Sequence, residues 1–285
     1  MSQNSNNITL SLYVPTYNSE KYLAQVLDSA KDLADEVVVV DSGSSDGTKK
    51  IAQSYKAKWV TRAFDNFQNQ RNFAIDQCTG DWILNLDDDE VLNPELAQYL
   101  QQVKQNNFVR PEAQDKTIEA YRVHRTWFVC GQKVSAFYPV RSPDHPIKLF
   151  KKSKNCYYDG SIVHIEQTGL KYESIIEGPG TILHYSCDDL KDLLVKRLST
   201  HAVGSSYDIL MKRPEITVTG CYISSVISAI SAWIKWYWLK DGYKDGKVGW
   251  VLGKYSYLYT RRKYLLLAKR LKAQSTKQQE NINAS

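Results

Sequence analysis

Three consecutive aspartates, Asp87, Asp88 and Asp89, directly follow the apolar stretch WILNL at residues 82–86. Carboxylates packed side by side repel one another unless a positive charge lies among them. Asp87 and Asp89 stand two positions apart after an expected strand, so both can reach one divalent cation, and carboxylate oxygens favour Mg²⁺ or Mn²⁺. The alternative is a cap on the next helix, but a cap needs only one acid. The triplet therefore predicts a metal site with positions open for substrate phosphates.

A second polar stretch, DSGSSDGT, begins at Asp41 after four consecutive valines. A carboxylate at the end of a buried strand can accept hydrogen bonds from a ribose or a base. The alternative is an ordinary loop in which Asp46 or Thr48 caps a helix, and the stretch alone does not decide between the two. The chain has neither a GxGxxG motif nor a P-loop, which argues against dinucleotide binding of the Rossmann type.

Residues of two further stretches could contact a nucleotide. Tyr17 lies in the turn PTYN, where its ring could stack on a base, although exposed tyrosines are common in turns. Gln70 and Arg71 lie on an expected helix, and a guanidinium there would match a diphosphate. The alternative for Arg71 is a simple surface arginine.

The elements that must position these residues alternate along the first 90 residues. Strands are expected at residues 8–14, 36–41, 58–64 and 81–86, and helices at 19–33, 48–57 and 67–78, with Ser19 as the cap of the first helix. This order predicts a parallel sheet with helices on both faces. Ligands bind such sheets at the carboxyl ends of the strands, where all three polar stretches are expected to meet.

Beyond residue 93 the pattern changes twice. A helix is expected at residues 95–105, and from Asp188 onward the chain is expected to be mostly helical. Between them, short β-like pieces predict an antiparallel extension of the sheet, at residues 119–129, 147–152, 160–167 and 181–186.

The net charge of +6 is unevenly distributed. From Leu190 onward there are 17 Lys and Arg residues against 6 Asp and Glu, so the first 189 residues carry a net −5. Basic and aromatic residues together suggest a nucleic acid or the anionic surface of a membrane, or else a solvated basic face. Residues 216–234 carry no charge but contain several Ser and Thr, so a membrane-surface or buried helix is expected there instead of a transmembrane one.

The five cysteines are scattered singly, which predicts reduced thiols in the cytoplasm. The first residues lack the basic-then-apolar order of a signal peptide, so export is not expected. We predict a cytoplasmic protein bound peripherally to the inner face of the cell membrane, with no nucleic-acid partner.

The motifs PTYN, VVVVDSGSSDGT and NQRNFAIDQCTGDWILNLDDDE, in this order, resemble family 2 glycosyltransferases of the GT-A fold over residues 8–96. Less tightly, PIKLFKK, LHYS and KDGYKDGKVGWVLG resemble the branch that includes bacterial lipopolysaccharide-core β-glucosyltransferases. The resemblance implies an α/β GT-A fold, a Rossmann-like mixed sheet with helices on both faces. We expect a catalytic domain at residues 1–187 and a helical, basic and aromatic region at 188–285.

The resemblance also implies roles for particular residues. Tyr17 would stack on uracil and Asp41 would bind the base, while Asp89 would be the principal ligand of Mn²⁺ or Mg²⁺. The implied metal ligands are Asp87, Asp89 and His184 of LHYS. The implied nucleotide-sugar site comprises Pro15, Thr16, Tyr17, Asn18, Asp41, Gln70, Arg71, Asp87 and Asp88.

The chain departs from this branch at the catalytic base. Related sequences carry an adjacent His-Glu pair, whereas here VHIEQ places Ile165 between His164 and Glu166. Residues two apart on a strand face the same side, so both can still point into the site. We expect Glu166 to be the base, with His164 and Asp144 as alternatives; Glu166 could instead be a surface residue.

These implications describe an inverting, metal-dependent transfer of a sugar from a UDP-sugar to a hydroxyl of a glycolipid or cell-surface glycan precursor, such as the lipopolysaccharide core. Glucose is the first choice of sugar, ahead of GlcNAc and galactose. Two other classes compete. A nucleotidyltransferase of sugar phosphates normally has a glycine-rich basic loop after the first strand, and PTYNSEKY lacks one. A nucleic-acid-binding protein would leave the acidic triplet unexplained.

Overall fold

The computed structural model describes residues 8–108, 119–153, 156–160, 165–168, 173–175, 179–194 and 198–283. The chain forms two compact units. The N-terminal unit comprises residues 1–126, 143–160 and 165–184, and the C-terminal unit comprises residues 127–142, 161–164 and 185–285. The chain therefore enters the C-terminal unit before residue 185, and the domain division that we predicted after residue 187 stays a prediction.

The N-terminal unit is built on a seven-stranded sheet of order β14-β6-β11-β4-β1-β2-β3. Its first four strands are parallel, as the alternating pattern predicted. Their bounds are β1 Leu10–Thr16, β2 Glu36–Asp41, β3 Lys58–Thr61 and β4 Trp82–Asn85. The helices between and after them are α1 Leu23–Ala30, α2 Thr48–Ser54, α3 Phe67–Gln77 and α4 Pro94–Gln105.

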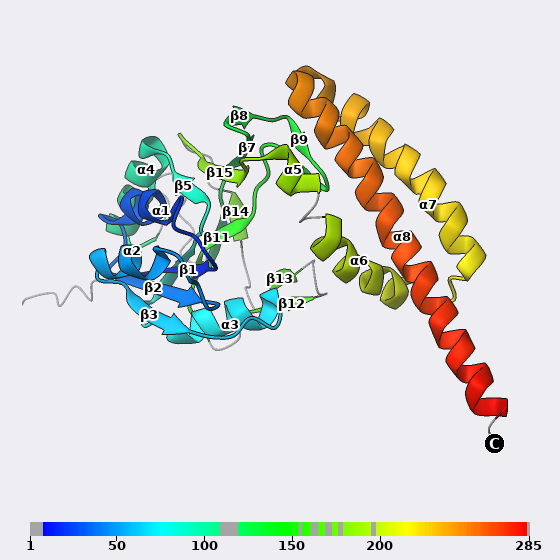
Figure 1. The fold of residues 1–285 in the computed structure, drawn as a ribbon. Helices are drawn as coiled ribbons and strands as arrows, with labels where there is room; N and C mark the ends of the chain where they lie inside the picture. Colours follow the sequence, from blue (N-terminus) through cyan, green and yellow to red (C-terminus); the bar gives the residue numbers. More distant parts are fainter. Residues whose placement is uncertain are drawn as a thin grey trace, which may run out of the picture. The chain divides into compact units, whose positions relative to one another are not determined.

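The strands are buried on both faces, because their apolar side chains alternate between two hydrophobic clusters. In β2, Val39 packs in one cluster, while Val38 and Val40 pack in the other. Figure 1 shows α1 and α4 on one side of this sheet and α3 on the other. This arrangement explains the continuous valine run, since a strand covered on both faces needs no polar side.

The second half of the sheet is mixed. β11 (Ile147–Lys151) runs antiparallel to β4 and to β6 (Ala120–Arg122), which confirms the predicted antiparallel extension for these two strands. The strands found near the predicted pieces 160–167 and 181–186 pair outside this sheet, so that part of the prediction was wrong. β14 (Glu173–Ile175) pairs with β6 in parallel, and β12 (Tyr157–Gly160) forms a hairpin with β13 (Ile165–Thr168). A short strand that we did not predict, β5 (Glu90–Leu92), pairs with β15 (Ile182–Cys187) directly after the acidic triplet.

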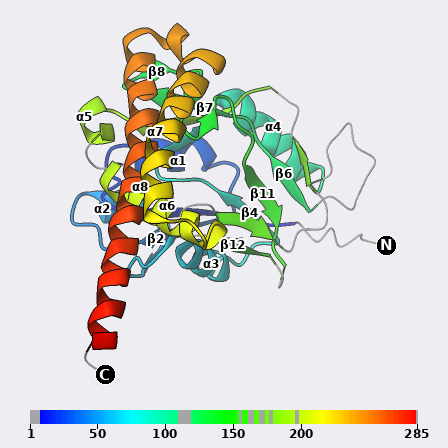
Figure 2. The same ribbon diagram turned by 90° about the vertical axis from the view of Figure 1, so that its right-hand side faces the viewer.

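The C-terminal unit is mainly helical. Two short antiparallel pairings precede the helices: β7 (Arg125–Val129) pairs with β8 (Gln132–Lys133), and β9 (Ala136–Phe137) pairs with β10 (Val140–Arg141). The helices are α5 Leu190–Asp192, α6 Leu198–Lys212, α7 Val218–Trp233, the π-helical η2 Ile234–Leu239, the 3₁₀ helix η3 Gly242–Asp245 and α8 Gly246–Asn283. Figure 2 shows α7 and α8 packed side by side as a long hairpin.

Candidate active site

The three polar stretches meet at one edge of the sheet, as predicted. Thr16 at the end of β1 lies in register with Asp41 at the end of β2. On the other side of β1, Tyr13 is opposite Asn85, the last residue of β4, and Leu86 N–H donates to the Tyr13 carbonyl over 3.3 Å. The acidic triplet therefore begins beside the end of β1, because parallel strands place their carboxyl ends at the same edge.

Asn18 joins the first two stretches. Its backbone N–H donates to Ser44 Oγ over 2.8 Å, and its side-chain carbonyl accepts from the Ser45 N–H over 2.9 Å. Its φ of 53° lies in the left-handed region, which asparagine tolerates better than most residues. Asn18 thus clamps the turn after β1 to the loop after β2.

Asp41 is buried and organises its own loop. One carboxylate oxygen accepts from the Gly43 and Ser44 N–H groups, each over 2.8 Å. The other accepts from the Thr16 and Ser44 hydroxyls. A carboxylate has about four acceptor positions, so this one is filled by donors of the chain. The contact of Asp41 with a base stays a prediction. It would require that a donor of the base replace one of these four hydrogen bonds.

Pro15 is half-buried at the end of β1 and Tyr17 is 63% exposed beside it. The Tyr17 ring is therefore accessible at the edge where the polar stretches meet. Gln70 is buried instead: its carbonyl accepts from Arg62 over 2.8 Å, and its amide donates to Ser42 over 3.2 Å. Gln70 thus supports the loop after β2 in this structure, and direct contact with a nucleotide stays a prediction.

Asp88 is tied to the turn after β1 through Ser19. The Ser19 hydroxyl donates to the Asp88 carboxylate and accepts from the Tyr17 N–H over 3.0 Å. Our assignment of Ser19 as the helix cap was wrong, because α1 begins at Leu23 and the serine side chain is turned to Asp88. Burial and then the charge of Asp89 raise the pKa of Asp88 to about 7, although the hydrogen bond from Ser19 opposes the shift.

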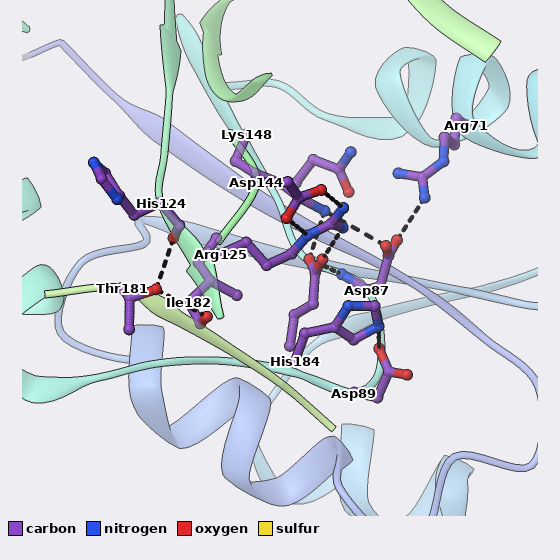
Figure 3. A network of polar contacts seen from close by, with 12 residues as sticks. Arg71, Asp87, Asp89, His124, Arg125, Asp144, Lys148, Thr181, Ile182 and His184 are labelled. Carbon is purple, nitrogen blue, oxygen red and sulfur yellow. Dashed lines mark hydrogen bonds and ion pairs between the residues drawn. The ribbon is translucent and has the colours of Figure 1, made fainter. Parts of the chain in front are cut away.

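Asp87 is paired with cations of the chain. One carboxylate oxygen lies 2.6 Å from Arg71, and the other lies 3.5 Å from the Lys148 amine (Figure 3). Burial opposes the ionisation of Asp87, but Arg71 and then Lys148 outweigh it and hold the pKa well below its usual value. Part of the positive charge that the triplet requires therefore comes from the protein itself.

Behind Asp87 lies a network of ion pairs that we did not predict. Glu90 in β5 is fully buried, and its carboxylate lies 2.7 Å from Arg125 and 2.5 Å from Lys148. It also accepts from the Asp87 N–H over 2.9 Å. Arg125 donates two hydrogen bonds to Asp144 (Figure 3). Asp144, the alternative candidate for the catalytic base, is therefore held in an ion pair.

The sequence carried signals for these residues. Lys148 interrupts the apolar run IKLF at a strand position where a lysine is buried only with a partner. Glu90 is the fourth acid of DDDE, directly after the triplet. Neither signal identifies the partner, because the strands that carry them are far apart in sequence.

Asp89 faces His184. The carboxylate of Asp89 lies 3.2 Å from His184 Nε2, and β15 places His184 opposite Glu90 (Figure 3). Among the described residues, no group of three or more His, Cys, Asp or Glu side chains is placed to hold a metal ion. Asp87 points to Arg71 and Lys148, so the three predicted metal ligands are not gathered in this conformation.

Asp89 and His184 nevertheless fit a shared ion. Neighbouring ligands around an octahedral Mg²⁺ lie about 3 Å apart, which is close to their separation here. Carboxylate oxygen and imidazole nitrogen also suit Mn²⁺. The assignment of Asp89 and His184 as metal ligands stays a prediction.

The predicted base lies on the β12–β13 hairpin. The backbone of Glu166 pairs with Asp159, while its side chain and the whole of His164 lie outside the described residues. The hairpin is anchored beside Arg71, because Asn72 exchanges two hydrogen bonds with the Tyr158 backbone and Arg71 lies over the Tyr158 ring.

Residues 11–169 match the model of Glycosyl transferase family 2. An uncharacterized glycosyltransferase of Rickettsia typhi is 36% identical over 94 residues, 33% of this chain and 32% of that protein. The lipopolysaccharide core biosynthesis glycosyltransferase LpsC of Rhizobium meliloti is 38% identical over 98 residues, 33% of this chain and 36% of that protein. The match thus spans about a third of the length of each relative.

Among solved structures, glucosyl-3-phosphoglycerate synthase of Mycobacterium tuberculosis, in complex with Mn²⁺ and UDP-glucose, covers 43% of this chain and 44% of its own, at 22% identity and a TM-score of 0.32. The mixed seven-stranded sheet with helices on both faces agrees with the predicted GT-A fold. The family match covers more than half of the chain, and this protein therefore belongs to glycosyl transferase family 2.

Proposed function

We propose that this family 2 glycosyltransferase moves a sugar, glucose first, from a UDP-sugar to a hydroxyl of a glycolipid or cell-surface glycan precursor such as the lipopolysaccharide core. The observation that carries the proposal is the Asp89–His184 pair beside the Asp87–Arg71 pair at the carboxyl end of β4. A diphosphate fits between an arginine and a bound cation, because both stabilise negative charge. Membership of the family argues against the two alternative functions, nucleotidyl transfer and nucleic-acid binding.

The uridine would lie at the exposed ring of Tyr17, which can stack on a base without rearrangement. Arg71 donates to Asp87 through one terminal nitrogen, and its guanidinium has further donors for a diphosphate oxygen. Glu90 keeps Lys148 and Arg125 in place behind Asp87. Together these residues would position the UDP-sugar and stabilise the negative charge of its diphosphate before the acceptor binds.

Asp89 and His184 would hold Mn²⁺ or Mg²⁺, and such an ion supplies positive charge beside the leaving diphosphate. Glu166 would take the proton from the acceptor hydroxyl as that oxygen attacks the anomeric carbon. Direct attack from the side opposite the diphosphate inverts the anomeric centre. An α-linked donor therefore yields a β-linked product and free UDP.

The test is a screen of UDP-sugar donors by UDP release, repeated for the variants Asp89→Asn and Glu166→Gln. We expect both to lose activity, while Asp32→Asn, an exposed aspartate near the end of α1, keeps it. Full activity of Glu166→Gln would move the base elsewhere and leave the transferase intact. Full activity of Asp89→Asn, or no turnover of any UDP-sugar by folded wild-type protein, would refute the proposal.

A further inference from the structure

Helix α7 exposes large apolar side chains, whereas the residues that it buries are all small. The residues that face inward are Cys221, Ser225, Ala229 and Ala232. The large apolar residues that face outward on α7 and on η2, which continues it, form what we call the α7 apolar face: Ile223, Val226, Ile227, Ile230, Ile234, Trp238 and Leu239. Ile227 is 65% exposed and Leu239 is 73% exposed.

In water this orientation of α7 is less favourable than the reverse one, with the isoleucines buried and the small residues exposed. Burying an isoleucine side chain is worth about 1.5–3 kcal/mol more than leaving it in water, and serine offers no such gain. An amphipathic helix of a soluble unit therefore turns its isoleucines inward. The face is also continuous: Ile223, Ile227, Ile230 and Ile234 follow at helical spacing, and in the π-helical η2 the residue five positions on, Leu239, returns to the side of Ile234.

Glycines of α8 allow a close approach to η2 and η3, which follow α7. Gly249 and Gly253 of α8 form a GxxxG pair in the sequence GWVLG. A Cβ on Gly253 would lie 3.1 Å from the Tyr237 side chain, and one on Gly249 would lie 1.7 Å from the Gly242 carbonyl oxygen. Close helix packing through small residues is typical of helices whose outer faces contact lipid.

Cations and aromatic rings border the same face. A shallow groove of about 520 Å³ is lined by Ile227, Ile230, Ile234 and Leu239 together with Lys235 and Lys240. At this end of the helix, Trp233, Tyr237, Trp238, Tyr243 and Trp250 contact one another. Tryptophan and tyrosine favour the boundary between lipid and water, and lysines attract anionic headgroups.

The charges of the neighbouring helix α8 indicate whether the α7–α8 hairpin lies on a membrane or crosses it. Val218–Leu239 is long and apolar enough by length and composition to span a bilayer. However, α8 carries exposed cations along the whole length of the hairpin, at Lys247, Lys254, Arg261 and Lys269. Charges at the centre of a bilayer are costly, so the hairpin would not cross as a pair.

We propose that the α7 apolar face lies in the headgroup boundary of a bilayer that contains anionic phosphate lipids, so that the C-terminal unit is held on one side of the membrane. The occupant of the face is a lipid surface, since lysines and tryptophans border the isoleucines. The proposal concerns residues of the C-terminal unit and none of the acidic triplet, and it stands whichever sugar the protein transfers.

The experiment is co-sedimentation of the full chain with vesicles of phosphatidylcholine, with and without phosphatidylglycerol. The test variant combines Ile227→Glu, Ile230→Glu and Ile234→Glu. The matched control combines Gln274→Glu, Ser275→Glu and Thr276→Glu, which changes the net charge equally at exposed positions of α8. We expect the test variant to lose at least about tenfold in binding to the anionic vesicles, and the control to bind within about twofold of wild type.

A second measurement keeps folding and catalysis separate. Melting temperature and UDP release without vesicles are recorded for wild type, the test variant and the control. A failure of the proposed transferase activity is then detected separately from a failure of lipid binding. Quenching of tryptophan fluorescence by brominated acyl chains is expected for wild type, and less of it for Trp238→Phe.

Three results would overturn the proposal. The first is a folded test variant that binds anionic vesicles as wild type does. The second is wild-type protein that resists alkaline carbonate extraction from membranes, because the helix would then span. The third is wild type that ignores vesicles and is dimeric by light scattering while the test variant is monomeric, because a second copy would then cover the face.

Discussion

The carboxylate of Asp87 lies 2.6 Å from the guanidinium of Arg71, across the edge where the sheet presents its polar loops. Both side chains are mostly buried, and Lys148 approaches the same carboxylate from the other side. The first aspartate of the triplet is thus neutralised by the protein, whereas Asp89 faces a histidine. The acids of one short stretch therefore have different partners and, we expect, different roles.

Replacing Arg71 by alanine should abolish most of the activity. The change removes the principal cation beside Asp87 and a donor for the diphosphate, so we expect kcat/KM for the UDP-sugar to fall by about a hundredfold or more. Arg71→Lys keeps the charge but loses the planar fork, and should lie between alanine and wild type. Steady-state UDP release measures both, and equal activity of the alanine variant and wild type would exclude a role in catalysis.

Glu90→Gln should destabilise the fold. Glu90 is fully buried between Arg125 and Lys148, and its loss leaves two cations with reduced compensation. Breaking a buried ion pair from one side costs about 3–5 kcal/mol. Urea unfolding at neutral pH gives the free energy directly.

The matched control for this change is Glu95→Gln, an exposed glutamate in the first turn of α4. It should change the free energy of unfolding by about 0.5 kcal/mol at most. Similar values for the two variants would show that the buried network contributes nothing to stability.

Asp88 should make the metal-free protein less stable as the pH rises. Its pKa is raised to about 7 from the ordinary value of 3.8, so the folded state holds a proton between these values that the unfolded state has released. That contribution is fully present below the ordinary pKa and is lost as the pH rises through 7. In chelator, the melting temperature of wild type should therefore fall relative to Asp88→Asn between pH 5 and pH 8.

Asp88→Asn is suitable for this comparison because its side-chain oxygen can still accept from the Ser19 hydroxyl. Parallel melting curves for the two proteins across this pH range would contradict the raised pKa. Since Asp88 neighbours the predicted metal ligand, the chelator must be present throughout.

Tyr17→Ala should weaken nucleotide binding with little effect on the fold, because the ring is exposed. Stacking of a base on an aromatic ring is worth about 1–3 kcal/mol, so the Kd for UDP should rise by about five- to 150-fold. Titration calorimetry measures this, and Tyr17→Phe should bind nearly as wild type does. Unchanged affinity in the alanine variant would place the uracil elsewhere.

Mn²⁺ and UDP together should stabilise wild type, by about 2.7 kcal/mol at a hundredfold excess over the dissociation constant. His184→Ala and Asp89→Asn should each abolish the part of the thermal shift that needs the metal, since these side chains face one another. Asp32→Asn should respond as wild type does. A full metal-dependent shift in both site variants would place the ion on other ligands.

Much of this protein could be predicted from local pattern. The alternation of strand and helix over the first 90 residues, the four valines of β2 and the polar stretches after three strands predict the parallel sheet and its ligand edge, because side-chain periodicity and turn chemistry act over a few residues. The acidic triplet was also recognisable from local pattern. Three adjacent carboxylates repel one another, so their presence alone indicates that a positive charge lies nearby.

Only the tertiary structure decided which partner each acid has. Arg71, Lys148 and His184 come from α3, β11 and β15. Packing of α3 on the sheet and pairing of the two strands bring them to the triplet from positions 16 to 95 residues away. The structure likewise decided that Glu90 is buried between two cations and that the isoleucines of α7 face outward, because burial depends on packing between distant elements and not on the residue type alone. Charge pairing and exposure are properties of the folded neighbourhood, which a linear pattern does not contain.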